Sequence, residues 1–186
     1  AEYRYDREPI GAIHGLAPER VVYAGSASKT LAPGLRLGWM IVPGDRVDAV
    51  GALKVANDRG SPSLEQLAFA DFLSKGEFDR HLRRMRPLYR ERRDALLDAL
   101  AEHLPDLRPI GASAGLHVLA WLPAGVNEAA LVAGAAARGV RMTDLAHTYS
   151  DPDRAPGGLI FSYGAVTASE IEEGVRLVAD ARAALD

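Results

Sequence analysis

The sequence predicts an α/β protein on the basis of three observations. Short apolar runs flanked by glycine, proline and small polar residues are typical of buried strands. Longer segments carry apolar residues at helical spacing, with charged residues between them. In the second half of the chain the expected elements follow the order strand, helix, strand, strand, helix, which indicates a small α/β sandwich. The 186 residues suit one domain, or one small domain with part of another.

The first half of the chain is expected to contain two strands followed by two helices. Residues 21–24 and 37–42 are apolar runs, and we expect them to pair with each other. Asp45 is placed to cap the first helix, and Ser63 with Gln66 has capping-box spacing at the start of the second. The expected buried face of the second helix comprises Leu64, Leu67, Ala68, Phe72 and Leu73.

A long helix is expected between residues 77 and 104, and Pro87 should kink or divide it. Thr167 and Glu170 have the spacing of a capping box at the start of the last helix. The elements expected after the long helix are a strand at 116–122, a helix at 127–138, strands at 140–142 and 159–163, and a helix at 168–184.

The segment between the first two strands has the composition of a phosphate-cofactor site. Lys29 lies in a small polar turn, and Arg36 follows seven residues later. A lysine amine that has lost its proton can form a Schiff base, and an arginine can bind phosphate oxygens through two parallel hydrogen bonds. With the hydroxyls of Ser26 and Ser28, these residues fit a pyridoxal-phosphate (PLP) site. The alternatives are a solvated lysine, a surface salt bridge for Arg36 and turn chemistry for the serines.

The segment from Val22 to Trp39, together with residues 1–6, resembles the fold-type-I PLP enzymes, and most narrowly the effector domain of MocR-type (GntR-family) transcription regulators. Those regulators join a winged-helix DNA-binding domain to an aminotransferase-like domain. The resemblance implies a partial PLP-dependent transferase (aspartate aminotransferase-like) fold. Residues 1–80 would be the C-terminal remnant of the large PLP-binding domain, and residues 81–186 the linking helix and the small C-terminal α/β domain.

The resemblance also implies roles for individual residues. Lys29 would be the Schiff-base lysine, and Arg36, Ser26 and Ser28 would contact the cofactor phosphate. In the family an Asp-x-Tyr element that contacts the cofactor ring lies a few residues before the segment matching the start of this chain. We therefore expect the C-terminal part of a longer protein, one that is not a competent transaminase by itself.

The expected substrate site is incomplete. In the family an arginine holds the substrate carboxylate, and Gly158 occupies the matching position here. Arg154 in the preceding loop is the candidate substitute, and an ordinary loop charge is the alternative. His147 and Tyr149 are weaker candidates for the edge of the pocket.

Composition limits the remaining functions. The net charge of −3 gives no support to general polyanion binding, and the lack of cysteine excludes disulfides and thiolate metal sites. The five histidines show no metal-ligand spacing. No apolar run approaches the ~20 residues of a membrane span. We expect a cytoplasmic protein that binds neither metal nor membrane. A dense basic run over residues 80–93 is interleaved with acidic residues, which favours a solvated, salt-bridged helix face over a DNA-binding stripe.

Three functions remain open. The first is the effector domain of a MocR-type regulator, in which PLP and an amine or amino-acid effector bind at Lys29 and DNA is bound by a domain outside this chain. The second is a class I/II aminotransferase, a PLP-dependent enzyme that transfers an amino group to a 2-oxo acid with Lys29 as general base. The third is a PLP-free dimerisation module. A homodimer is expected because the first two strands would have exposed edges.

Overall fold

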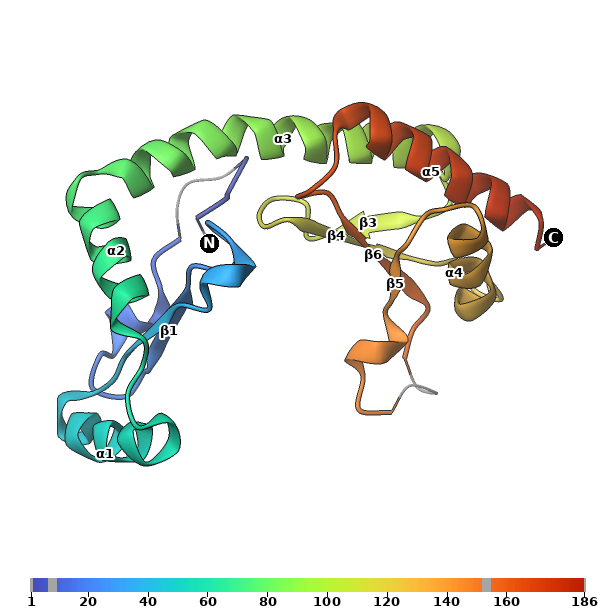
Figure 1. Ribbon diagram of the computed structural model, residues 1–186. Helices are drawn as coiled ribbons and strands as arrows, with labels where there is room; N and C mark the ends of the chain where they lie inside the picture. The colour runs from blue at the N-terminus through green and yellow to red at the C-terminus, as the bar shows by residue number, and fades with distance from the viewer. Residues whose placement is uncertain (1, 7–9, 152–154, 186) are drawn as a thin grey trace. The chain divides into compact units, whose positions relative to one another are not determined.

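The computed structural model describes residues 2–6, 10–151 and 155–185. It divides into two compact units, which we call the lysine unit (residues 8–83) and the sheet unit (residues 3–7 and 84–186). The elements in chain order (Figure 1) are η1 (Ile13–Leu16), β1 (Tyr23–Ser26), η2 (Pro33–Leu35), β2 (Gly38–Ile41), η3 (Gly44–Arg46), α1 (Val47–Asp58), α2 (Ser63–Ser74), α3 (Glu77–His103), β3 (Arg108–Ile110), β4 (His117–Trp121), α4 (Glu128–Ala137), β5 (Thr143–Asp144), η4 (Ala146–Thr148), β6 (Gly158–Ser162) and α5 (Ala168–Ala183).

In the lysine unit, β1 and β2 form a two-stranded antiparallel sheet, which confirms the predicted pairing. Tyr23 lies opposite Ile41, and Ser26 lies opposite Gly38. Gly25 is required where it stands, because a Cβ atom there would lie 2.4 Å from the indole of Trp39. The indole therefore packs directly over the β1 backbone.

The two predicted caps in the lysine unit are wrong. Asp45 lies in η3, and α1 begins after Arg46 without a side-chain cap. The residue before α2 is Pro62, and Gln66 donates its side-chain amide to the Pro62 carbonyl oxygen (2.9 Å) instead of closing a capping box with Ser63. Local spacing identified both helices, but the backbone at each start places the cap position one residue away from the predicted side chain.

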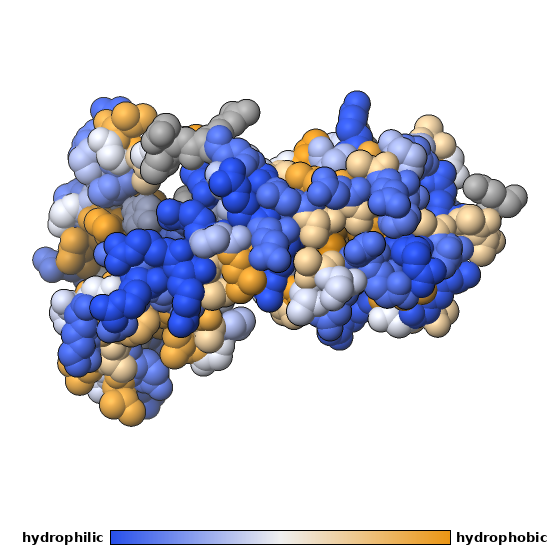
Figure 2. All heavy atoms as spheres, turned by 90° about the horizontal axis from the view of Figure 1, so that it is seen from above, coloured by the Kyte–Doolittle hydropathy of each residue, from blue (hydrophilic) through white to orange (hydrophobic). Residues whose placement is uncertain are grey.

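The predicted buried face of α2 is also wrong. Leu64 is 75% exposed and Leu67 is 68% exposed, and neither α1 nor α2 contains a buried residue. Figure 2 shows apolar side chains at the surface of this unit. The apolar pattern is that of a covered helix, but the described part of the lysine unit supplies nothing that covers it.

The sheet unit is built on a four-stranded antiparallel sheet in the order β3-β4-β6-β5. Val118 lies opposite Phe161 and Ala120 opposite Leu159, and all four side chains are buried. Because successive side chains of a strand point to opposite faces, these two cross-strand pairs form one apolar face. The predicted strands at 116–122 and 159–163 are confirmed as β4 and β6.

Helices supply the rest of this core. The C-terminal half of α3 buries Leu96 and Leu100, and α5 buries Ile171, Val175 and Val178. Side chains cap the N-termini of α4 and α5. The Asn127 side chain accepts from the Ala130 amide at α4, and Thr167 with Glu170 forms the predicted capping box at α5. The capping box predicted at α5 is confirmed. Thr167 and Glu170 lie within one helical turn, where spacing in the sequence fixes their geometry.

Two strand predictions need correction. The strand expected at 140–142 is found at β5, because the Val140 amide bonds back to the Ala135 carbonyl at the end of α4 (2.9 Å) and pairing with β6 begins only at Thr143. The sequence did not predict β3. That strand has three exposed residues around Pro109 and lies at the sheet edge, where proline is tolerated.

Helix α3 runs unbroken through Pro87, so the expected division does not occur. The basic run on α3 is not uniformly solvated, because Arg93 is only 5% exposed and forms ion pairs with Asp6 and Asp94. Arg90 also pairs with Asp6 (3.2 Å), and Arg92 donates to the Gly164 carbonyl (2.7 Å). These arginines hold the sheet unit together, which favours the structural interpretation over a DNA-binding stripe.

Within the sheet unit, residues 3–6 are bonded to the segment at residues 113–115 through backbone and side-chain groups. The Tyr5 amide donates to Ser113, and the Tyr5 hydroxyl donates to the Gly115 carbonyl (2.6 Å), which also accepts from the Tyr163 hydroxyl (2.7 Å). Burial is the main cause that raises the pKa of both phenols. None of the helices in the described ranges combines the length and the apolarity that a membrane span requires.

Candidate functional site

The loop between β1 and β2 carries the predicted cofactor residues. The Ala27 amide donates to the Leu37 carbonyl (2.9 Å) and extends the β1–β2 ladder by one step. The loop is thus closed at its base by backbone bonds. Lys29 and Arg36 both project from this one loop, as their positions between the two strands predicted.

Lys29 lies in a turn whose neighbouring residues are buried. Ala27 is fully buried and Thr30 is 4% exposed, whereas Lys29 itself is exposed. The Leu31 amide donates to the Ala27 carbonyl (2.8 Å) and closes the turn. The Thr30 hydroxyl donates to the same carbonyl (3.4 Å). The backbone on both sides of Lys29 is therefore fixed while its amine is left accessible.

The other lysines of the chain, Lys54 and Lys75, are engaged. Lys54 pairs with Asp58 (2.5 Å), and Lys75 pairs with Asp71 (2.7 Å), each at i,i+4 spacing on a helix. The hydrogen bond to Asp71 is the main cause that raises the pKa of Lys75, which keeps that amine protonated. Among the described residues Lys29 has no such carboxylate partner, so it is the lysine best placed to react.

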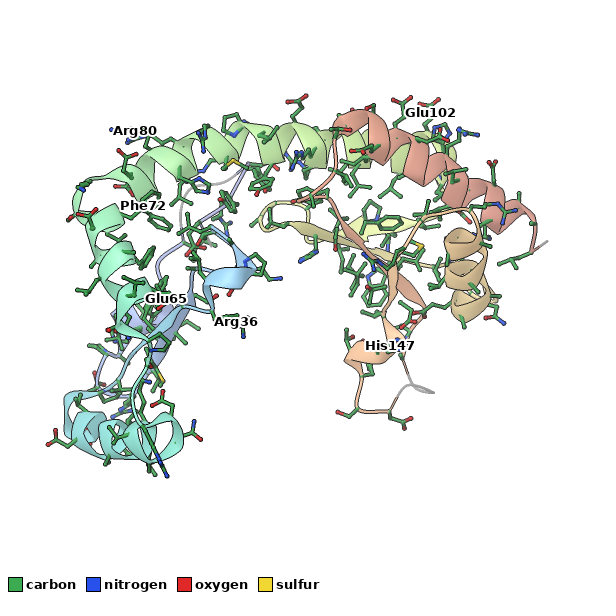
Figure 3. All side chains as sticks on the ribbon, in the orientation of Figure 1. Arg36, Glu65, Phe72, Arg80, Glu102 and His147 are labelled. Carbon is green, nitrogen blue, oxygen red and sulfur yellow. The ribbon has the colours of Figure 1, made fainter. Side chains whose placement is uncertain are left out.

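Arg36 ends the short helix η2. Its amide donates to the Pro33 carbonyl (3.3 Å), and its backbone is left-handed with φ at +48°. Figure 3 shows its side chain extending from the loop. Non-glycine residues in this conformation are uncommon and are found at functional sites more often than elsewhere. The tight turn aims the guanidinium into solvent-accessible space.

Arg36 also lines a cavity of about 1050 Å³ in the lysine unit, together with Trp39, Phe69 and Phe78. Lys29, Ser26 and Ser28 are not among its lining residues. Ser26 and Ser28 lie together, since the Ser26 hydroxyl oxygen accepts from the Ser28 amide (3.1 Å). That contact leaves the Ser26 hydroxyl proton free to be donated to an anion. The structure thus places the serines beside the lysine turn and Arg36 at the cavity.

The substrate-side candidates lie in the sheet unit. Arg154 falls outside the described residues. A Cβ at Gly158 would lie 3.1 Å from the Leu145 side chain and 3.3 Å from the Ala120 carbonyl oxygen, so a side chain there would fit tightly. His147, on η4 (Figure 3), bonds to Asp144, and this contact raises its pKa. Gly158 therefore presents no side chain at the start of β6 that could bind a carboxylate.

Sequence analysis did not identify Glu128, which fixes the backbone at the start of β6 and just before η4. Glu128 reaches from the first turn of α4 and accepts from the backbone amides of Leu145 (2.5 Å), Ala146 (3.2 Å) and Gly158 (3.2 Å). It ties the start of η4 to the start of β6. No local pattern marks such a residue, because its partners lie 17 to 30 positions away.

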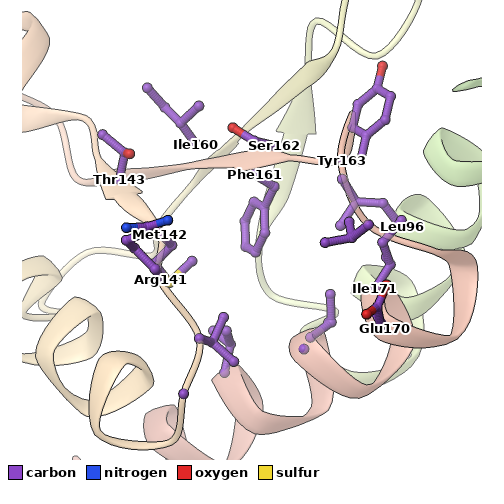
Figure 4. A pocket seen from close by; sticks show the side chains of 16 residues that line it. Leu96, Arg141, Met142, Thr143, Ile160, Phe161, Ser162, Tyr163, Glu170 and Ile171 are labelled. Carbon is purple, nitrogen blue, oxygen red and sulfur yellow. The ribbon is translucent and has the colours of Figure 1, made fainter.

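A second cavity, of about 570 Å³, lies within the sheet unit. Figure 4 shows the Phe161 ring pointing from β6 towards α5, with Ile160 on the opposite face of the strand. The lining combines apolar residues with polar ones such as Arg141, Thr143 and Ser162, and the carboxylate of Glu170 is already used in the α5 capping box. Within the described residues no cluster of His, Cys, Asp or Glu could hold a metal ion.

Comparison with known proteins identifies the family of the chain. Residues 4–178 match the family model of aminotransferase class I and II. The chain is 34% identical to the HTH-type transcriptional regulator YhdI of Bacillus subtilis, covering 99% of this chain and 39% of that protein. It is 35% identical to the probable rhizopine catabolism regulatory protein MocR of Rhizobium meliloti, covering 100% and 38%. It is 31% identical to aromatic-amino-acid aminotransferase 1 of Thermococcus litoralis, covering 96% and 43%.

Solved structures of aminotransferases are also similar to this chain. The kynurenine aminotransferase of Pyrococcus horikoshii, in complex with PMP, superposes with a TM-score of 0.91 at 27% identity, over 99% of this chain and 46% of that one. LysN of Thermus thermophilus, complexed with N-(5'-phosphopyridoxyl)-L-leucine, gives 0.89 at 27% identity, over 99% and 48%. The chain spans less than half the length of these relatives, and its fold is a partial α/β aminotransferase-like fold.

Proposed function

Because the chain belongs to the aminotransferase class I and II family, we propose that its lysine unit binds PLP through Lys29. We further propose that the chain is part of the aminotransferase-like effector domain of a MocR-type regulator. The observation that carries the proposal is the exposed amine of Lys29, which has no carboxylate partner in the described part of the chain, on a turn whose backbone is held by buried neighbours. A fixed backbone with a free amine is what condensation with an aldehyde requires.

The residues present fit the cofactor chemically. When bound, PLP supplies an aldehyde and an electron-withdrawing ring. Lys29 would hold the aldehyde carbon after its amine loses a proton. Arg36 and the Ser26 and Ser28 hydroxyls would bind phosphate oxygens and orient the group. In the family the cofactor is PLP, which the PMP and phosphopyridoxyl complexes of the two solved relatives support.

Effector sensing is favoured over turnover by the start of β6. Gly158 carries no side chain that could hold a substrate carboxylate, and the two regulators compared above match the chain over nearly its whole length. We propose that an amine or amino acid acts as effector and that DNA is bound through a part of the regulator outside this chain. Catalytic amino-group transfer is the second candidate, supported by the likeness to the Thermococcus enzyme.

Reductive trapping tests the site. The 186-residue chain is mixed with PLP, reduced with borohydride, and the modified lysine is identified by peptide mass spectrometry. We expect the label on Lys29 in the unaltered chain and in Lys75→Ala, and its loss in Lys29→Ala. Labelling spread equally over the three lysines would contradict the proposal.

The same samples test the second candidate function. Conversion of bound PLP to pyridoxamine phosphate is followed by its absorbance in the presence of a panel of amino acids. We expect no conversion above the rate of free PLP. The chain spans less than half of its relatives, and in those proteins positioning by residues outside the matched segment contributes to turnover. Clean conversion by the 186 residues alone would favour the enzyme.

We also propose that the chain forms a homodimer. The sheet of β1 and β2 contains two strands, and several large apolar side chains of α1 and α2 are exposed. Open strand edges and apolar surface both favour association. Light scattering over a concentration series should give a mass near twice that of the chain, and a constant monomer mass at high concentration would contradict the dimer.

A further inference from the structure

A histidine of α3 bonds to the lysine turn. The Nε2 atom of His81 lies 2.8 Å from the carbonyl oxygen of Thr30, the residue that follows Lys29. A carbonyl oxygen only accepts, so Nε2 must carry a proton, which it does in one neutral tautomer and in the imidazolium ion. The bond is therefore available whether or not His81 is charged. Both groups lie within the lysine unit.

The start of α3 is held in place by aromatic packing. Phe78 lies one helical turn before His81, on the same face of the helix. Its ring meets Phe69 edge-on (centroids 5.6 Å apart) and also contacts Phe72 (6.5 Å). Phe69 in turn stacks on Trp39 of β2 at 5.8 Å. This series of rings connects β2 to the start of α3, the helix that carries His81.

His81 binds a different carbonyl group from the one that the hydrogen bonds within the turn use. The Leu31 amide and the Thr30 hydroxyl both donate to the Ala27 carbonyl, on the N-terminal side of Lys29. The carbonyl on the C-terminal side, that of Thr30, accepts from His81. The backbone of Lys29 is thus held from both sides, once within the turn and once from α3.

We propose that His81 is a positioning residue that sets the backbone of Lys29 for reaction of its amine with an aldehyde cofactor. The inference rests on the proposed role of Lys29. It extends that role to a side chain 52 positions away in the sequence, which acts through the Thr30 carbonyl and does not touch the cofactor.

The first test is the rate of trapping at Lys29 as a function of PLP concentration. His81→Leu removes the donor at similar size, His81→Gln restores one, and His103→Leu removes a half-buried histidine at the far end of the same helix. Loss of one hydrogen bond should slow trapping at saturating PLP about two- to tenfold in His81→Leu. The half-saturating concentration should change less, because the phosphate ligands are intact. His81→Gln should recover part of the rate, and His103→Leu should match the unaltered chain.

The second test needs no cofactor. Hydrogen exchange of the Leu31 amide should be faster in His81→Leu than in the unaltered chain and in His103→Leu, with far-UV circular dichroism unchanged. Equal Leu31 exchange in the three proteins, or equal trapping rates in His81→Leu and the unaltered chain, would overturn the inference. If the unaltered chain gives no adduct at Lys29, the proposed function fails, and the exchange measurement alone decides the role of His81.

Discussion

The lysine unit and the sheet unit bury their apolar residues very differently. In the sheet unit Val118, Leu131 and Leu159 are fully buried, whereas Ala27 and Pro43 are the buried apolar residues among the described residues of the lysine unit. Leu53 and most other large apolar side chains of the lysine unit are exposed. Burial is the main favourable contribution to folding. The sheet unit can therefore stabilise itself, while the unit that carries the reactive loop relies on hydrogen bonds and stacked rings.

Truncation of a leucine in each unit should give the largest difference. Leu131→Ala on α4 leaves a cavity in a fully buried position and should lower the free energy of unfolding by about 2–5 kcal/mol. Leu67→Ala on α2 removes a side chain that is 68% exposed and should change it by less than about 0.5 kcal/mol. Urea unfolding followed by circular dichroism measures both. Equal losses would mean that the apolar face of α2 is covered in solution.

Substitutions at helix starts should also lower the free energy of unfolding more in the sheet unit than in the lysine unit, by less than the leucine truncations do. Thr167→Ala removes the capping-box side chain of α5 and should cost about 1 kcal/mol of unfolding free energy. Ser63→Ala, at the start of α2, removes a hydroxyl that makes no cap and should have little effect. Thermal melts of the two variants test this. A larger loss for Ser63→Ala would contradict the assignment of Pro62 as the residue before the helix.

Acid should weaken the sheet unit through Asp6. Its hydrogen bond with Arg93 is the main cause that lowers its pKa from 3.8 to about 2. A carboxyl with a lowered pKa contributes stability fully above its ordinary pKa and loses it as pH falls through the folded value. The free energy of unfolding should thus fall between about pH 4 and pH 2, and less so in Asp6→Asn. Asp98→Asn, which changes an exposed acid on α3, the helix of Arg93, serves as the control and should follow the unaltered chain.

The lysine loop could be predicted from sequence because its parts are close together. Lys29 and Arg36 are joined by a short loop, and the two apolar runs around it have no other strand to pair with in the lysine unit. The capping box at Thr167 was predictable for the same reason, since one helical turn fixes its geometry. The site assignments drawn from these residues remain proposals that trapping can test.

The sequence by itself determined the α/β class, the strands β4 and β6, and the segment that carries Lys29, because strand alternation and turn chemistry are local properties. Only the tertiary structure decided that His81 bonds to Thr30, that Arg93 pairs with Asp6 and that Glu128 binds the start of β6. It also decided that the apolar face of α2 stays exposed. Long-range contacts and burial depend on the path of the whole chain, which no local pattern records.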